Sequence, residues 1–331
     1  MRPYYNYKKN LVTISLSIFI LMMNGCKKDV QVETSFTQLA SASVFNNPLT
    51  ATAALTYIYS QMATNTNGES FAASQTFGLM ADELTNHSTQ TSNLQWYTNS
   101  MVATSNSGEW NNWYSYIYQA NAIIAGVQNN GNISPLIQQQ LIGESKFIRA
   151  FSHFYLTNSY GDVPLVTGTD YTINGSIKRT PQAQVYQQII NDLSSAENLL
   201  NAGYVDITDT LTTTERVRPN KSAAAALLAR VYLYANKYDS AEIQSTLAIN
   251  NVGLYSLCPN LSGPTNSVFL KNSTEAIWQI QTPLPAGQNT GDGSGFILTS
   301  APSTGNTNST SISPQLLSSF ETNDKRKTNW I

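Results

Sequence analysis

The chain has 331 residues, of which 41% are hydrophobic and 10% aromatic, so it is long enough for about two domains and a substantial core. Only 11% of the residues are charged, against about 25% in an average soluble domain, and Asn, Gln, Ser and Thr supply most of the polarity. With 18 Lys and Arg against 20 Asp and Glu, the net charge is −2, which excludes the basic field that nucleic-acid binding requires. The aromatic content excludes disorder of the bulk of the chain.

Residues 1–25 have the features of a secretory signal. Basic residues at positions 2, 8 and 9 precede an apolar run over 11–23, which is too short to span a bilayer. Asn24-Gly25-Cys26 then resembles a bacterial lipoprotein processing site, at which the Cys26 thiol takes a diacylglycerol and becomes the new N-terminus. We therefore expect lipidation at Cys26 and a polar tether over about 27–37. The alternative is an ordinary signal peptide with an incidental Cys.

Helical periodicity dominates the next two hundred residues. Apolar side chains recur at i, i+3, i+4 and i+7 in segments that open with Pro or a capping residue and end at Gly or Asn. At one start, we expect the Thr180 hydroxyl to cap a helix that begins at Pro181, and at another Asp239 and Glu242 approximate a capping box. The predicted helices are 48–62, 109–127, 138–160, 181–200, 221–236 and one from 239 onward.

The last two of these helices carry a repeat signature. Small and aromatic residues have the spacing of a 34-residue tetratricopeptide unit, in which two antiparallel helices approach closely: Ala229, Tyr232, Tyr238, Ala241 and Ala248. The sequence therefore predicts a mainly α fold of tetratricopeptide-like helical hairpins with long irregular loops and little strand. Asn121, the only polar residue in the apolar stripe of its helix, is expected to bind a neighbouring backbone segment.

Two stretches lack this periodicity. Residues 64–108 are rich in Asn, Ser, Thr and Gly, which predicts a long functional or disordered loop. After residue 255 we expect mostly loop, with a strand over 275–281, a short helix over 314–320 and no helix at the end of the chain. The expected domains are residues 26–255, helical, and 256–331, loop-rich.

Few residues offer catalytic or metal-binding chemistry. His87 and His153 have no ligand-forming partner at helical spacing, so no metal site is expected. We expect His153 to be packed and hydrogen-bonded, and His87 to be solvated. Asp82 and Glu83 would point about 100° apart on a helix, which suits a solvated face better than a glycosidase pair. Cys258 is expected to be buried. No catalytic residue and no cofactor is predicted.

Aromatic and amide side chains remain as candidates for ligand binding. Sugar rings present an apolar face that aromatic rings cover, and a hydroxyl rim that amides and backbone groups bind. Trp96, Tyr97 and Asn99 offer this mixture within the irregular stretch. They are the candidate ligand-binding residues. Alternatively, Trp96 and Tyr97 anchor the loop to the core.

Several motifs together resemble the SusD/RagB family of Bacteroidetes surface lipoproteins. They are Cys26-Lys27-Lys28-Asp29, residues 116–124 (YIYQANAII), 143–150 (GESKFIRA) with 160–165 (YGDVPL), Arg179-Thr180-Pro181, Pro219-Asn220-Lys221, Glu275-Ala276-Ile277-Trp278 and Asp324-Lys325-Arg326. The resemblance covers essentially the whole mature chain, and the block at 143–165 is the most specific part.

The resemblance implies capture of glycans or other nutrients at the cell surface, without catalysis, by a protein anchored to the outer membrane through its lipid. It also implies delivery to a SusC-like TonB-dependent transporter. Family members are usually longer, so we expect the chain to be C-terminally truncated. Two alternatives stay open: a helical-repeat adaptor lipoprotein that binds only protein, and a glycosidase.

Overall fold

The computed structural model describes residues 41–63, 70–102, 105, 108–265, 267–281, 289–304 and 308–331. The predicted signal peptide over 1–25 and Cys26 lie outside the described residues. The helices are α2 (Ser41–Val44), α3 (Pro48–Met62), α4 (Ala72–Met80), α5 (Thr91–Tyr97), α6 (Gly108–Val127), α7 (Pro135–Tyr160), α8 (Tyr171–Asn174), α9 (Gln182–Leu199), α10 (Lys221–Tyr234), α11 (Tyr238–Ile249), α12 (Gly291–Phe296), α13 (Pro314–Ser319) and α14 (Lys325–Trp330).

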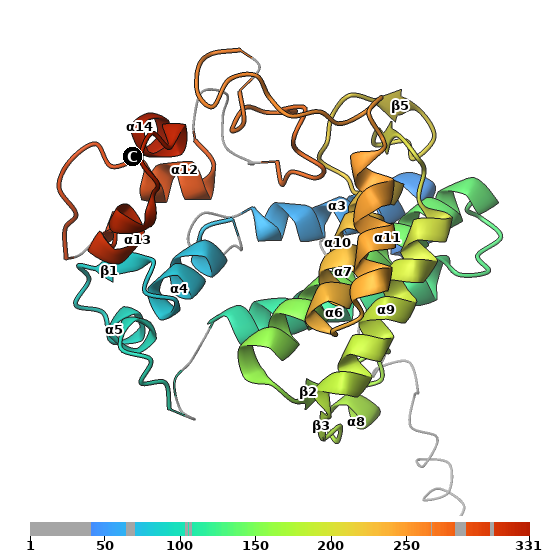
Figure 1. The fold of residues 1–331 in the computed structure, drawn as a ribbon. Helices are drawn as coiled ribbons and strands as arrows, with labels where there is room; N and C mark the ends of the chain where they lie inside the picture. The colour runs from blue at the N-terminus through green and yellow to red at the C-terminus, as the bar shows by residue number, and fades with distance from the viewer. Residues whose placement is uncertain are drawn as a thin grey trace, which may run out of the picture. The chain divides into compact units, whose positions relative to one another are not determined.

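The long helices stack side by side (Figure 1). Helix α7 packs between α6 and α9, α10 packs on α9, and α11 packs on α10, while α3 lies against α6 and α7. Gly143 makes one of these contacts possible, because a Cβ there would lie 3.0 Å from the Leu200 side chain. The predicted mainly α fold of helical hairpins is confirmed, and the five helices predicted with both a start and an end form within three residues of those bounds.

Strand is limited to three short antiparallel pairs in the described part of the chain. They are β1 (Leu84–Asn86) with β6 (Thr310–Ile312), β2 (Val163–Pro164) with β3 (Arg179–Thr180), and β4 (Tyr204–Val205) with β5 (Thr212–Thr213). The first pair joins segments more than 200 residues apart, with Leu84 opposite Ile312. It therefore holds the region of α4 and α5 beside residues close to the end of the chain.

Side chains close several helix starts, although not always as predicted. The Asn47 and Asn220 carboxamides accept the Leu49 and Ala223 N–H groups. Thr180 instead pairs in β3, and Asp162, distant in sequence, accepts the Gln182 N–H at 2.9 Å. The expected Thr180 cap is therefore wrong, because sheet pairing takes that residue.

The predicted capping box at Asp239 is also wrong. Helix α11 begins earlier, at Tyr238, and its N-cap residue is Lys237, which makes no side-chain capping bond. Asp239 lies inside the first turn, where its charge still suits the positive end of the helix dipole.

The structure corrects three expectations for the irregular stretches. Residues 64–108 contain α4, β1 and α5 rather than one long loop. Residues 275–281 are not a strand: Gln279 N–H donates to Arg216 O, but no neighbouring strand pairs with the segment in the described chain. Ile277, Trp278 and Ile280 pack instead against the helical core, which explains their apolar pattern. The final described residues form α14 rather than loop.

Asn121 and Arg149 join three segments inside the bundle. Arg149 forms a bidentate pair with Asp192 of α9, at 2.6 and 2.8 Å, and donates to the Asn121 side chain at 2.7 Å. Asn121 in turn donates to the carbonyls of Val166 and Gly168. The prediction that Asn121 binds a neighbouring backbone segment is confirmed.

His153 is fully buried one turn further along α7. Its Nδ1 lies 3.0 Å from Arg149 O, and because a carbonyl only accepts, Nδ1 carries the proton. Burial lowers the pKa of His153 to about 4. The expectation of a packed, hydrogen-bonded His153 is confirmed.

Candidate functional site

A hollow lies beside α5, in the region that the sequence singled out for ligand binding. Its volume is about 240 Å³, and its lining contains no ionisable side chain: Thr91, Ser92, Gln95, Trp96, Met101, Val102 and Ser105. Helix α5 contributes four of these residues. The helix itself packs against α4 and β1, so the fold holds this lining in place.

Trp96 provides the aromatic surface of the hollow. It is half-buried, and its indole N–H has no hydrogen-bond partner among the described residues. Among the other lining residues, Ser105 Oγ donates to Gln95 Oε1 at 2.9 Å and accepts the Val102 N–H at 3.0 Å. An aromatic face with hydroxyl and amide groups around it suits a neutral sugar ring.

Tyr97 and Asn99 do not line this hollow. Asn99 follows α5 with a left-handed backbone (φ 50°), and its carboxamide donates to Met80 O at 3.2 Å. It therefore terminates α5 and ties it to α4. Tyr97 is the last residue of α5 and is partly exposed. The ligand-binding roles of Tyr97 and Asn99 stay predictions, as does that of Trp96.

The pairing of β1 with β6 supports α5 from the other side. His87 follows β1, and its Nε2 lies 2.9 Å from Ser311 Oγ of β6, while its N–H donates to Ser309 O. His87 is therefore half-buried rather than solvated as expected. Asp82 and Glu83 are both exposed, as expected for a solvated face.

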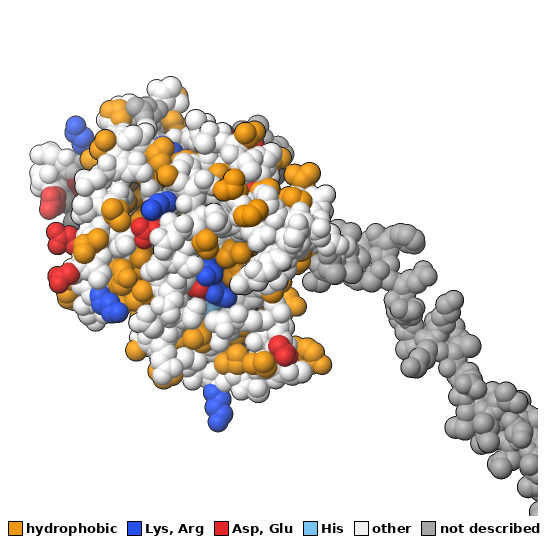
Figure 2. All heavy atoms as spheres, turned by 90° about the vertical axis from the view of Figure 1, so that its right-hand side faces the viewer, with side chains coloured by type: hydrophobic (Ala, Val, Ile, Leu, Met, Phe, Trp, Pro, Cys, Tyr) orange, Lys and Arg blue, Asp and Glu red, His pale blue; other side chains and the backbone are white. Residues whose placement is uncertain are grey.

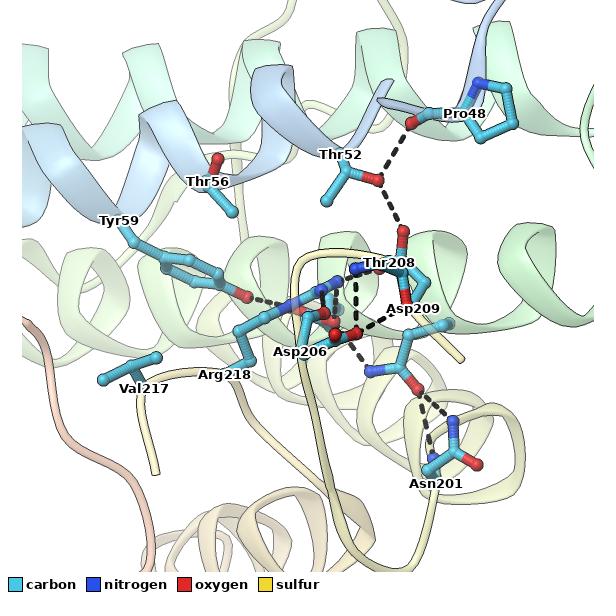
Figure 3. A network of polar contacts seen from close by, with 12 residues as sticks. Pro48, Thr52, Thr56, Tyr59, Asn201, Asp206, Thr208, Asp209, Val217 and Arg218 are labelled. Carbon is cyan, nitrogen blue, oxygen red and sulfur yellow. Dashed lines mark hydrogen bonds and ion pairs between the residues drawn. The ribbon is translucent and has the colours of Figure 1, made fainter. Parts of the chain in front are cut away.

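A second polar cluster lies inside the bundle, where α3, α7 and the β4–β5 hairpin meet (Figure 3). Arg218 forms ion pairs with Glu144, at 2.6 Å, and with Asp209. Tyr59 and Gln140 each donate to Glu144 at 2.7 Å, and Thr52 donates to Asp209. Every charged group here is hydrogen-bonded, as burial requires.

The electrostatics of this cluster follow from burial and from one excess negative charge. Burial raises the pKa of Asp209, although Arg218 opposes the shift. Burial lowers the pKa of Arg218, but Glu144 and Asp209 outweigh it and raise that pKa above its usual value. Glu144 and Asp209 are 0% and 2% exposed, so a ligand cannot reach them. The cluster stabilises the fold and is not a binding site.

Arg218 and Asp209 carry no sequence motif that points to this cluster. Glu144, which pairs with Arg218, lies among apolar residues on helix α7, and so does Arg149. A charged residue inside an apolar stripe indicates that it has a buried partner of opposite charge. The partners themselves lie in a turn and on another helix, with no local pattern to mark them.

Among the residues that the structure describes, metal and thiol chemistry offer no further site. Within the described residues no group of three or more His, Cys, Asp and Glu side chains could hold a metal ion. Cys258 is half-buried rather than buried, and a hydrogen bond with the Thr274 hydroxyl lowers the pKa of its thiol. In the same part of the chain no helix is long and apolar enough to cross a membrane.

Three solved or curated proteins illustrate what this chain is similar to. It is 29% identical over 172 residues to SusD-like protein P2 of Formosa agariphila, covering 51% of this chain and 31% of that relative. A SusD superfamily structure from Parabacteroides distasonis has a TM-score of 0.68 at 22% identity, over 88% of this chain and 62% of that one. A laminarin-binding SusD-like protein has a TM-score of 0.55 at 23% identity, over 64% of this chain and 46% of that one.

The match to the Formosa agariphila relative thus spans about a third of that protein's length, and the structural likenesses concern the fold alone. A family model described as "SusD-like: Starch-binding associating with outer membrane" matches residues 35–233, well over half of the chain. This match includes α3 to α10, the hollow beside α5 and the buried Arg218 cluster. The chain therefore belongs to the SusD-like family that this model describes.

Proposed function

We propose that this protein captures neutral oligosaccharides or polysaccharides at the cell surface, with Trp96 as the stacking platform, and breaks no bond in them. The observation that carries the proposal is the hollow beside α5, whose lining combines one half-buried indole with hydroxyl and amide groups. Membership in a starch-binding family and the fold shared with a laminarin-binding protein support the choice of a glycan.

The proposal extends to the setting in which the glycan is captured. Cys26 carries the lipid that anchors the chain to the outer membrane, and the captured glycan passes to a SusC-like TonB-dependent transporter. We further propose that residues 26–255 form the helical domain, and that 256–331 begin a second, loop-rich domain. The family description, which names the outer membrane, supports this setting.

Affinity electrophoresis in gels that contain laminarin or starch tests the capture of glycans. We expect retardation of the wild-type protein and a loss of affinity of about tenfold or more in Trp96→Ala, as for an aromatic anchor in a pocket. Trp330→Ala is the matched control, because Trp330 is also partly exposed but contacts Phe269 instead of the hollow. If Trp96→Ala is retarded as strongly as the wild-type protein, the indole does not contribute to glycan binding.

The absence of catalysis has its own measurement. Incubation of the protein with each retained glycan is expected to release no reducing ends. Their release, at a rate that scales with protein concentration, would revive the glycosidase alternative.

A protein-binding adaptor is the second candidate function. The outer side of α11 favours it, because Ile243 and Leu247 lie one turn apart and are both exposed. Mobility that no polysaccharide alters, together with a loss of binding to the transporter in Ile243→Asn, would favour the adaptor.

A further inference from the structure

Four exposed apolar side chains gather at the end of the bundle where the chain enters it. Leu49 and Leu136 stand in the first turns of α3 and α7, and Ile207 and Leu211 flank the tip of the β4–β5 hairpin. Their exposed fractions are 61%, 68%, 70% and 62%. We call these four residues the entry-end patch.

Hydrogen bonds link the elements that carry the patch. Thr52, one turn after Leu49, donates to Asp209, which lies two residues from both Ile207 and Leu211. Gln140, one turn after Leu136, accepts from Asn201 at 2.8 Å, just before that hairpin. Near the beginning of the described chain, Asn130 donates to Phe45 O at 2.7 Å. The starts of α3 and α7, the β4–β5 hairpin and the turn after α6 therefore lie at the same end of the bundle as the first described residues.

Charge is sparse in the segments that carry the patch, since residues 41–62 and 126–143 contain no charged residue and the β4–β5 hairpin contains only Asp206 and the buried Asp209. Figure 2 turns the right-hand side of Figure 1, where β5 lies, toward the viewer and shows apolar side chains with charged ones spread between them. The opposite end, around α8 and β3, exposes Asp162, Asp170, Lys178 and Arg179. That end also exposes Tyr171 and Ile173, so the two ends differ in their charge and not in whether they expose apolar side chains.

We infer that the entry-end patch rests on the lipid surface to which the protein is anchored, with the four side chains at the headgroup boundary. The inference rests on the proposed lipidation of Cys26. Residues 27–40 join that Cys to Ser41, and fourteen residues span at most roughly 50 Å. The anchor therefore keeps this end of the bundle at a high effective concentration beside the membrane. At such a concentration a few apolar contacts are enough to hold the patch on the lipid surface.

Depth-dependent fluorescence quenching tests the inference on the acylated full chain. In a Cys258→Ser background, a bimane label is attached at Ile207→Cys or, as the matched control, at Ile173→Cys of α8. Both are exposed isoleucines, at 70% and 60%, near opposite ends of the bundle. Each protein is reconstituted into phosphatidylcholine vesicles with or without brominated phosphatidylcholine.

We expect the brominated lipid to reduce the fluorescence of the label at position 207 about twofold and to leave that of the label at position 173 unchanged. An apolar patch at the membrane surface enters the boundary between headgroups and acyl chains by about 5–10 Å, which brings its label close to the bromine atoms. Equal quenching at both positions, or no quenching at either, would overturn the inference. A dimer, detected by sedimentation, in which both labels are shielded from bromine would overturn it as well. Mass spectrometry of the same samples reports acylation of Cys26. An unmodified Cys26 refutes the proposed anchor, whereas an acylated protein without quenching refutes only the resting surface.

Discussion

Removal of the Arg218 guanidinium should destabilise the protein strongly. Arg218→Met keeps much of the side-chain volume but leaves Glu144 and Asp209 buried without their shared cation. Removing one partner of a buried ion pair costs about 3–5 kcal/mol, mainly because the remaining charge is uncompensated. Here two carboxylates remain, so we expect the upper part of that range.

The variant should also respond to pH in a characteristic way. Without Arg218, nothing opposes the burial that already raises the pKa of Asp209, so that pKa in the folded state rises further above its value in the unfolded chain. The folded state then binds more protons, and the loss of stability relative to wild type should shrink as the pH falls from about 7 toward 5.

Urea unfolding, followed by tryptophan fluorescence at pH 7 and pH 5, measures both effects. With a slope of about 3 kcal/mol per molar urea, the loss corresponds to a midpoint more than about 1 M lower at pH 7. Arg326→Met is the control, because Arg326 pairs with Asp324 at the surface, where water screens the interaction and its removal leaves no buried charge. If both variants unfold at the same urea concentration, the buried pairs do not stabilise the fold as argued.

Three further predictions concern single residues. His153→Leu should flatten the pH dependence of stability: the neutral buried ring has a pKa of about 4 against about 6.5 when unfolded, so wild type should lose about 3 kcal/mol as the pH falls through this window, measured by urea unfolding. Gly126→Ala should cost about 1–3 kcal/mol in the same assay, because its Cβ would lie 2.1 Å from the Phe45 ring. Cys258 should react with Ellman's reagent in the native protein, and Thr274→Val should slow the reaction at pH 7, because it removes the hydrogen bond that lowers the thiol pKa.

Each of these predictions has a control or a contrary result. His87→Gln should keep the pH dependence of wild type, and an equal flattening in both variants would contradict the assignment to His153. Gly131→Ala meets no atom within 4 Å, so a loss of stability equal to that of Gly126→Ala would exclude overpacking as the cause. An unreactive Cys258 would contradict the half-exposed thiol.

Local sequence pattern determined the long helices and the family. The apolar spacing within 48–62 and 109–127 predicts α3 and α6 closely, because helical periodicity depends only on residues within a few turns. The motif at 143–150 lies within α7 and is part of the most specific block of the resemblance to the SusD/RagB family. The same local reasoning placed Trp96 among the candidate residues, and the structure puts its ring at the hollow.

Tertiary structure alone decided how distant residues combine. Arg218 lies 74 residues from Glu144, Asp162 caps a helix that begins 20 residues later, and β1 pairs with a strand near the end of the chain. The apolar residues of 275–281 predict a strand, but no strand of the described chain pairs with this segment, and its side chains pack against the helical core instead. Periodicity specifies which face of a segment is buried, whereas the partner buried against that face depends on contacts that no local pattern contains.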